Sequence, residues 1–328
     1  MKKIIVAIIG LIIFSEGISQ DTAIEKVAAD SSSFIYLADP TIFPYDKKFY
    51  LYGTVEKNAR QGYLVYVSDD CKKWKLSDKN DGYALKKGEA FGSTGFWAPQ
   101  VFHYNEKFYM AYTANENIAI AWGDHPTGPF TQGNKTALKA PVKQIDPFVF
   151  IDDDGKKYLY HVRLINGNRI FVAEMSDDFS SIKEETLREC ISATEPWENT
   201  TGGGWPVTEG PTVIKHKGVY YLFYSANDFR NENYAVGFST SNHPLGPWQK
   251  SPANPILNKQ LVAQPGTGHG DFFQYKKQWY YVFHTHYNDA KVSPRKTGLI
   301  KAAFKGRNQA SDEVVFDKKS FYFFQNVE

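Results

Sequence analysis

The sequence contains little cysteine and no excess of charge of either sign. Only 2 of its 328 residues are Cys, which is too few for a disulfide-stabilised scaffold. Lys and Arg number 38 against 36 Asp and Glu, so the chain lacks the basic surface that a general nucleic-acid binder needs. No apolar run beyond the N-terminal segment is long enough for a transmembrane helix. These absences argue against a disulfide-rich mini-protein, a nucleic-acid-binding protein and a membrane-spanning protein, and they leave the oligomeric state open.

The N-terminal segment has the pattern of a secretory signal peptide. A short basic start precedes an apolar run over residues 4–14, and small residues precede a cut after position 19. Eleven apolar residues are too few to span a bilayer, which needs about 20. We therefore expect residues 1–19 to be removed, the protein to be exported (periplasmic or extracellular), and residues 20–328 to form one domain. Export permits a Cys71–Cys190 bridge, but the sequence leaves that pairing open.

One phrase recurs five times along the chain: an apolar strand, a short polar turn and an aromatic-rich strand. The copies occupy residues 41–52, 100–112, 147–160, 211–224 and 271–284. Each copy is a β-hairpin signal. We expect third strands at 63–67, 118–122, 170–174, 235–239 and 298–304, each followed by a weaker fourth strand. Units of this kind predict an all-β protein, a five-bladed β-propeller with four antiparallel strands per blade.

The residues just ahead of the five hairpins are the chemically informative ones, because the first strand of each propeller blade lines the central channel. These residues are Asp39, Trp97, Asp146, Glu209 and His269. In four of the five blades a Pro follows shortly afterwards; it suits the start of a strand and is expected to hold its predecessor extended. The long, Gly-rich stretch 190–208 is interpreted as an insertion on the face that carries this ring.

Three carboxylates in one ring have no evident structural purpose. Taken singly, Asp-Pro and Glu-Gly-Pro are ordinary turn sequences, and a lone His on a strand is usually a core residue. The sequence, however, places Asp39, Asp146 and Glu209 at the same phase of the repeat in three different blades. Like charges held together repel and raise one another's pKa, an arrangement that suits acid–base chemistry near neutral pH.

At these residues the sequence resembles glycoside hydrolase family 43, five-bladed propeller enzymes that act on arabinose- and xylose-containing polysaccharides. The matching motifs are Ala38-Asp-Pro40, Trp97-Ala-Pro99, Asp146-Pro-Phe148, Glu209-Gly-Pro211 and Gly268-His269. The resemblance covers nearly the whole mature chain and implies an inverting mechanism. It implies Asp39 as the general base, Glu209 as the general acid, and Asp146 as the residue that orients the acid and tunes its pKa.

The resemblance also implies contacts to the sugar and to a metal. Trp97, together with the adjacent Phe96, would form an aromatic wall of the sugar pocket, although a core role for Trp97 stays open. Arg295 and Arg163 are the candidates for an arginine that binds sugar hydroxyls. The family position of His269 lies close to a metal, often calcium, on the propeller axis. Calcium prefers oxygen ligands, so such an ion would be held mainly by water. No organic cofactor is implied.

The expected function is therefore an exported, inverting glycoside hydrolase with a carbohydrate substrate. An exo-acting α-L-arabinofuranosidase or β-xylosidase is favoured, because no appended carbohydrate-binding domain is recognisable in the sequence. An endo-arabinanase and a galactan- or galactofuranose-directed glycosidase stay open, as does a non-catalytic propeller that binds glycans. A retaining, invertase-type propeller is disfavoured, because Ile145 precedes Asp146 where that type has Arg, and the pair Glu189-Cys190 is not at the head of a blade.

Overall fold

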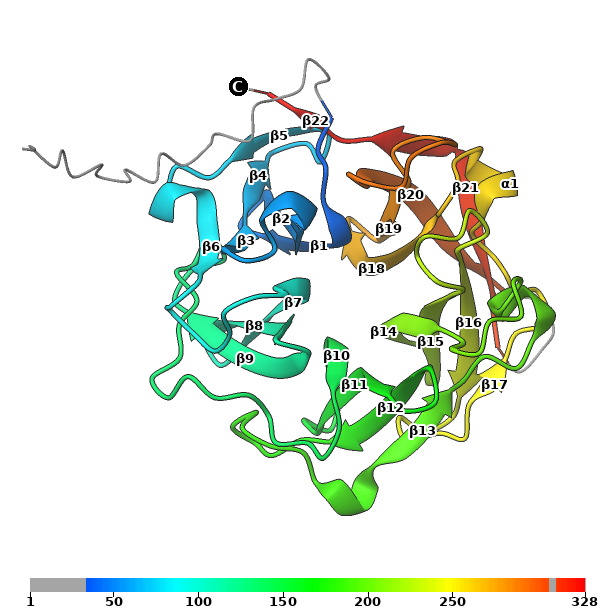
Figure 1. Cartoon of the computed structure of the whole chain (residues 1–328), viewed down its shortest axis with the longest axis horizontal. Coiled ribbons are helices and arrows are strands. Elements are labelled where there is room, and N and C mark those ends of the chain that lie inside the picture. The colour runs from blue at the N-terminus through cyan, green and yellow to red at the C-terminus, as the bar shows by residue number, and fades with distance from the viewer. Residues whose placement is uncertain (1–33, 307–310, 328) are drawn as a thin grey trace, which may run out of the picture. The chain divides into compact units, whose positions relative to one another are not determined.

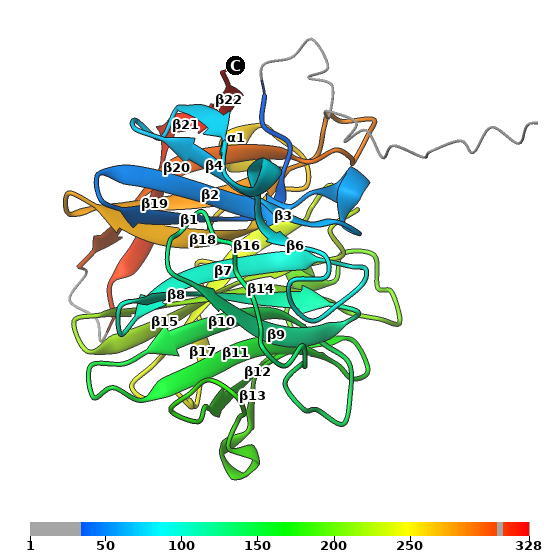
Figure 2. The same ribbon diagram turned by 90° about the vertical axis from the view of Figure 1, so that its left-hand side faces the viewer.

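The computed structural model describes residues 34–306 and 311–327. The expected signal peptide, residues 1–19, lies outside the described residues. From Phe34 onward the chain forms one unit, in which the sheets are arranged as five blades around a central axis (Figure 1). Figure 2 shows the same blades turned by 90°. The predicted five-bladed, all-β propeller is confirmed.

Each blade begins with an antiparallel hairpin beside the axis, at the positions where the repeats predicted one. The hairpins are β1 (Ala38–Tyr45) with β2 (Lys48–Thr54), β7 (Trp97–Tyr104) with β8 (Lys107–Ala114), β10 (Gln144–Ile151) with β11 (Lys157–Leu164), β14 (Thr208–His216) with β15 (Val219–Ala226), and β18 (Gly268–Tyr275) with β19 (Gln278–Thr285). The third strands are β4 (Tyr66–Ser68), β9 (Asn117–Gly123), β12 (Asn168–Glu174), β16 (Ala235–Ser241) and β20 (Lys296–Lys305). The pattern of short polar turns between aromatic-rich runs therefore predicted the positions of these strands.

The outer edges of the blades are less regular than the prediction of four strands. Outer strands are β5 (Lys73–Leu76), β13 (Arg188–Ile191), β17 (Gln249–Lys250) and β21 (Glu313–Phe323). In blade 2 the described outer edge is a single bridge between Trp122 and Thr131. In blade 1 the expected third strand divides at Val65, because β3 (Gly62–Leu64) leaves the blade to pair with β6 (Tyr83–Lys86).

Helical structure is confined to short turns between strands. The one α-helix is α1 (Lys259–Val262) within the described ranges, and 3-10 turns occupy Glu56–Asn58, Asn80–Gly82, Glu184–Thr186 and Pro196–Glu198. Among the described residues there is no helix with the length and apolar character that a membrane crossing requires.

The two ends of the described chain close the ring between blades 5 and 1. The backbone N–H of Ile35 donates to Phe324 O at 3.1 Å, and Thr297 N–H donates to Ile35 O at 3.1 Å. A short C-terminal strand, β22 (Gln325–Asn326), then pairs in parallel with β5 of blade 1. Because first and last blades are cross-linked by backbone hydrogen bonds, the ring does not depend on side-chain packing alone for its closure.

Aromatic side chains fill the spaces between neighbouring blades, which explains an aromatic content of 16%. Tyr52 and Tyr112 belong to the cluster between blades 1 and 2, and Tyr160 and Tyr224 to the cluster between blades 3 and 4. Their hydroxyls are also used: Tyr160 Oη donates to Pro244 O at 2.6 Å, in the turn of the next blade, and Tyr52 bonds Pro126 O in the equivalent way. The nearly repeated His-Pro-x-Gly-Pro turns supply these carbonyls.

Cys71 and Cys190 both carry free thiols, so the bridge that the sequence left open is not formed. Cys71 is buried in the cluster between blades 5 and 1, whereas Cys190 lies on β13 at the outer edge of blade 3.

We predict that Tyr160→Phe destabilises the protein although it leaves the aromatic packing intact. The change removes the hydroxyl bonded to Pro244 O and leaves a buried carbonyl unpaired, which costs about 1–3 kcal/mol. Thermal unfolding should show a lower Tm for this variant, by a few degrees. Tyr45→Phe is the matched control, because Tyr45 is 40% exposed. Equal Tm values for the two variants would contradict the role of the interblade hydrogen bond.

Candidate active site

The first strand of every blade carries a β-bulge at the same place. In blade 1 the register shifts between Ala38 and Thr41, and the other four blades shift at the equivalent point. The residues inside the bulges have positive φ: Asp39 (49°), Ala98 (45°), Asp146 (54°), Gly210 (60°) and His269 (39°). The expectation that the residue before each Pro is extended is therefore wrong, because the bulge requires a left-handed backbone there.

The bulges also show that the ring residues do not all stand at the same position of the repeat, although the sequence suggested that they do. Asp39, Asp146 and His269 occupy the bulge itself, whereas Trp97 and Glu209 stand one residue earlier. The three carboxylates are therefore not at one phase of the repeat. They still meet near the axis, because the local kink of a bulge re-aims the neighbouring side chain. Asp39, Asp146, Glu209 and His269 are each only 6–8% exposed.

The N–H group of each bulge residue donates a hydrogen bond to a residue of the preceding blade. Ala98 N donates to Thr54 Oγ1 (2.9 Å), Asp146 N to Thr113 Oγ1 (2.9 Å), His269 N to Ser225 Oγ (2.7 Å), and Asp39 N to His284 Nδ1 (3.1 Å). In blade 3 the equivalent position is Val162, which offers no acceptor. The N–H of Gly210 instead donates to Asp146 Oδ2 at 3.2 Å.

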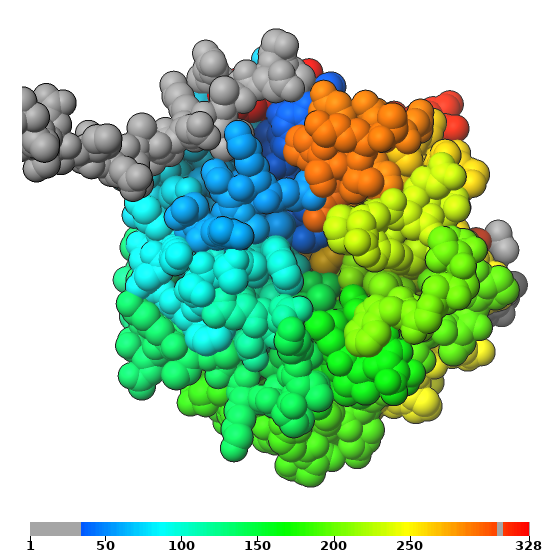
Figure 3. Space-filling view, viewed as in Figure 1, coloured from blue at the N-terminus to red at the C-terminus, as the bar shows by residue number. Residues whose placement is uncertain are grey.

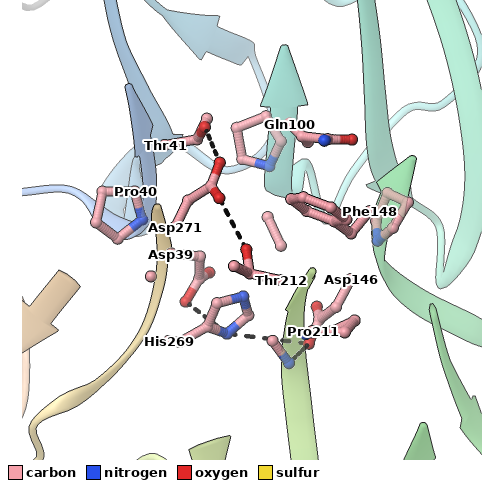
Figure 4. Close-up of a pocket in the computed structure, with 15 residues that line it drawn as sticks. Asp39, Pro40, Thr41, Gln100, Asp146, Phe148, Pro211, Thr212, His269 and Asp271 are labelled. Atoms are coloured by element: carbon pink, nitrogen blue, oxygen red, sulfur yellow. Dashed lines mark hydrogen bonds and ion pairs between the residues drawn. The ribbon is translucent and has the colours of Figure 1, made fainter. Parts of the chain in front are cut away.

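These residues surround a narrow space on the axis. Asp39, Asp146, His269 and Asp271 are among its lining residues. Figure 4 shows Asp39 and Asp146 on either side of His269, with Asp271 held between Thr41 and Thr212 farther along the channel. The face shown in Figure 3 is hollowed at its centre, where the blades meet.

The charge of Arg295 and a hydrogen bond from Thr54 favour the ionised form of Asp39. Arg295 Nη1 and His269 Nδ1 each lie 3.3 Å from Asp39 Oδ1, and Thr54 Oγ1 donates to Oδ2 at 2.7 Å. Burial raises the pKa of Asp39, but the charges of His269 and Arg295 and the Thr54 hydrogen bond outweigh it, so the pKa lies below its ordinary value. A carboxylate that stays ionised is suited to accept a proton from water.

Glu209 has the opposite electrostatic setting. Its Oε1 accepts from Tyr234 Oη at 2.8 Å, and its Oε2 accepts from Asn168 Nδ2 at 3.0 Å. Burial raises its pKa, the Tyr234 hydrogen bond lowers it, and the negative charge of Asp39 raises it again, with a net pKa of about 7. Glu209 therefore retains a proton at pH values where an exposed Glu has lost it. Such a group is suited to donate a proton.

Asp146 is coupled to Glu209. Burial raises the pKa of Asp146 well above its ordinary value, and the charges of Glu209 and Asp39 raise it further. The hydrogen bond from Gly210 N–H and the charge of Arg295 act against this by favouring the ionised form. The Gly210 bond offsets only part of this, and the pKa of Asp146 stays well above its ordinary value. A negative charge on either of the two carboxyls therefore favours a proton on the other.

A bulged propeller ring that lowers the pKa of one buried carboxyl and raises that of another is a setting for glycoside hydrolysis, and comparison with known proteins decides the family. The model of the glycosyl hydrolases family 43 matches residues 35–306. The chain belongs to glycosyl hydrolases family 43. It is therefore a glycoside hydrolase, and the mechanism of this family inverts the anomeric centre.

Solved and curated relatives agree with this family. A structure described as an endo-1,4-β-xylanase from Bacteroides thetaiotaomicron superposes with a TM-score of 0.83 at 40% identity and covers 91% of this chain and 99% of its own. A xylosidase/arabinosidase of Humicola insolens is 25% identical, over 76% of this chain and 88% of its own. A β-D-galactofuranosidase of Aspergillus niger is 30% identical, but the match spans 63% of this chain and 58% of that protein.

The two residues predicted to form an aromatic wall, Trp97 and Phe96, differ in exposure. Trp97 is partly exposed at the start of β7. Phe96 is fully buried and packs against Tyr63 and Tyr112 with ring centroids 5.8 and 6.3 Å away. The prediction of Phe96 as a substrate contact is therefore wrong, because its ring belongs to the core between blades 1 and 2.

The two predicted arginines lie in different places. Arg295 sits at the ring beside Asp39, and Glu56 orients it by accepting from its Nε at 2.9 Å and from its backbone N–H at 2.7 Å. Arg163 is 4% exposed on β11, where its Nε donates to His161 Nε2 at 3.1 Å and its Nη2 lies 3.8 Å from Glu184. The contacts of Arg163 thus lie within blade 3, and only Arg295 is brought together with the ring carboxylates.

Several residues of the site carry no signal in the repeats. Glu56 holds Arg295 and Tyr234 holds Glu209 from the connections after second strands, which differ in length and sequence between blades. Asn168 holds Glu209 from the first position of β12. His284 is different, because it stands at the same position of β19 that Thr54 has in β2. Comparing second strands position by position would have found the acceptors, but the hairpin pattern alone does not.

The described residues assemble no protein-held metal site. Within residues 34–306 and 311–327, no three His, Cys, Asp or Glu side chains come together as metal ligands. His269 faces Asp39, and the oxygens of Asp271 accept from Thr41 and Thr212. This donor set fits only a cation held mainly by water, and no chemical step is assigned to one.

We predict that two Val/Thr exchanges at the interblade acceptor position differ in their effect on stability. Thr113→Val leaves the buried N–H of Asp146 unpaired and should cost about 1–3 kcal/mol of stability. Val162→Thr gives the N–H of Gly210 a hydroxyl acceptor and should cost little. Val172→Thr, at a fully buried site of the same blade, is the control for introducing a hydroxyl. Chemical denaturation measures all three, and a Val162→Thr variant as unstable as Val172→Thr would refute the acceptor rule.

Proposed function

We propose that this protein hydrolyses arabinose- or xylose-containing polysaccharides or oligosaccharides with inversion, releasing terminal sugars as an α-L-arabinofuranosidase or β-xylosidase. Asp39 is the general base that activates water, Glu209 is the general acid, and Asp146 orients Glu209 and supports its pKa. The observation that carries this proposal is the opposite displacement of two buried carboxyls, with the pKa of Asp39 lowered and that of Glu209 raised to about 7.

The reaction follows from these protonation states. Glu209 gives its proton to the oxygen of the glycosidic bond as that bond breaks. Asp39 takes a proton from a water molecule whose oxygen bonds to the anomeric carbon from the opposite side. Arg295 keeps Asp39 ionised and offers donors to sugar hydroxyls, and the partly exposed ring of Trp97 offers an apolar face. Single inversion leaves Glu209 ionised and Asp39 protonated until solvent restores them.

The names of relatives support this substrate class and one alternative. The Humicola insolens relative is described as a xylosidase/arabinosidase, and the Bacteroides thetaiotaomicron structure as an endo-1,4-β-xylanase. The Aspergillus niger relative is described as a β-D-galactofuranosidase, so galactofuranosides are the second candidate substrates. The choice between terminal and internal cleavage rests on loops around a shared ring.

The test is hydrolysis of aryl α-L-arabinofuranoside, β-D-xyloside and β-D-galactofuranoside, together with xylan and arabinan. We expect turnover of one aryl glycoside by the wild type, and NMR should show the product with inverted anomeric configuration. Glu209→Ala should lose at least about 10²-fold in kcat on substrates with poor leaving groups. It should recover on a dinitrophenyl glycoside, which needs no protonation, whereas Asp39→Ala should not recover.

Glu189→Gln, on the outer strand of blade 3, is the control and should keep wild-type turnover. Binding of sugars that survives Glu209→Ala, without hydrolysis of any substrate by the wild type, would instead indicate a glycan-binding propeller.

We predict that kcat/KM falls as the pH rises through about 7. Glu209 must be protonated to act, and burial with the charge of Asp39 keeps its proton up to that pH. Asp146→Asn removes a negative neighbour, lowers the pKa of Glu209, and should move this alkaline limb to lower pH. The pH profile of kcat/KM for the two proteins measures the shift. An unchanged limb in Asp146→Asn would contradict the tuning role of Asp146.

We also propose export, on the basis of the pattern in residues 1–19, and a largely hydrated calcium ion near His269, on the basis of the family resemblance. N-terminal sequencing of the protein secreted by its host tests the first. Thermal melts with calcium and with EDTA test the second, and equal Tm values would count against the ion.

A further inference from the structure

The insertion 190–208 places a tryptophan beside the proposed acid. Trp205 is 53% exposed, the most exposed of the large hydrophobic side chains described. Its indole Nε1 donates to Asn168 Oδ1 at 2.9 Å. The ring is therefore held at its polar edge while much of its apolar surface faces solvent.

The backbone on both sides of this contact is tied together. Asn168 N–H donates to Pro206 O at 2.9 Å, and Thr208 Oγ1 donates to Asn168 O at 3.0 Å. Gly167 has φ +124°, and a Cβ there would lie 2.5 Å from Pro206 O. The end of the insertion is thus strapped along the start of β12, so the position of Trp205 is set by several independent bonds.

Asn168 connects Trp205 to Glu209. Its amide accepts from the indole with Oδ1 and donates to Glu209 Oε2 with Nδ2 at 3.0 Å. The indole N–H is a donor only, so it requires the oxygen end of the amide on its side. The nitrogen end must then face Glu209. Trp205 therefore selects the amide orientation that stabilises the ionised form of the acid.

The neighbours of Glu209 and those of Asp39 come from different blades. Asn168 and Trp205 approach from blade 3 and the insertion that follows it, whereas Asp39 belongs to blade 1 and Arg295 to blade 5. In an inverting reaction the base stands on the side of the attacking water, and the acid stands at the leaving-group oxygen. A surface that is bonded to the acid and comes from a different blade than the base is therefore expected on the leaving-group side.

We propose that the exposed indole of Trp205 is the platform on which the sugar ring of the leaving group stacks, and that Asn168 couples this platform to the acid. The inference rests on the proposed role of Glu209. The ligand class is a pyranose or furanose residue linked through the scissile oxygen. As the glycosidic bond breaks, the proton of Glu209 passes to that oxygen, and Asn168 Nδ2–H stabilises the carboxylate left behind.

The platform is tested with two substrates that differ only in the leaving group. Xylobiose is compared with methyl β-D-xyloside, or arabinobiose with methyl α-L-arabinofuranoside, according to the sugar that the wild type releases. Both members of a pair need protonation, but only the disaccharide has a ring to stack. Trp205→Ala should lower kcat/KM for the disaccharide about tenfold more than for the methyl glycoside. Trp122→Ala, at another exposed tryptophan (41%), should change neither.

The coupling is tested with Trp205→Phe, which keeps a stacking ring but has no N–H. The Asn168 amide is then free to turn its oxygen toward a protonated Glu209. The alkaline limb of kcat/KM should move to higher pH, while the ratio between the two substrates stays near the wild-type value. The other charged or titratable groups acting on Glu209 are Tyr234, Asp39, Asp146 and Arg295, and this variant leaves all four in place.

Equal losses on both substrates in Trp205→Ala would overturn the platform, and an unmoved limb in Trp205→Phe would overturn the coupling. Titration calorimetry separates these failures from failure of the proposed function. Glu209→Gln protein, with and without Trp205→Ala, is titrated with xylotriose and arabinotriose. Weaker binding in the double variant supports the platform even if the wild type hydrolyses neither sugar, and equal binding refutes it.

Discussion

The bulge in the first strand of each blade is the constraint on which the site depends. A left-handed residue near the axis leaves its N–H outside the strand ladder, and a buried N–H without a partner is costly. Blades 1, 2, 4 and 5 satisfy that group in the next blade with a hydroxyl or an imidazole from the second strand. The same bond therefore positions a ring residue and docks one blade against its neighbour.

The one exception to this rule among the five bulges is Gly210, the residue directly after Glu209. Because Val162 offers no acceptor, the Gly210 N–H turns to Asp146, and a carboxylate replaces the hydroxyl used elsewhere. That bond draws Asp146 to the residue directly after Glu209. Burial by itself would raise the pKa of all three carboxyls. The partners make the difference: Asp39 has Arg295 within 3.3 Å, whereas Glu209 has two neutral donors, the negative charge of Asp39 and only a weaker effect of Arg295.

The sequence was informative wherever the structure repeats. Hairpins, blade number and the ring residues Asp39, Asp146 and His269 could be predicted, because five copies of one pattern locate the same strand five times. A pattern without backbone angles could not show that Glu209 precedes its bulge residue. Nor could it separate the buried Phe96 from the partly exposed Trp97, since neighbouring aromatics carry the same signal.

Residues outside the repeat were not predictable for a related reason. Glu56 and Tyr234 lie in connections after second strands, Asn168 is the first residue of β12, and Trp205 belongs to the connection between β13 and β14. Connections of this kind lie outside the strand ladders and are free to vary, so the repeat carries no signal for the residues on them. In the proposed mechanism the ring supplies the acid and the base, and these connections would decide which sugar reaches them. We therefore expect the sugar specificity of this protein to depend more on residues such as Trp205 than on the carboxylates that identify its family.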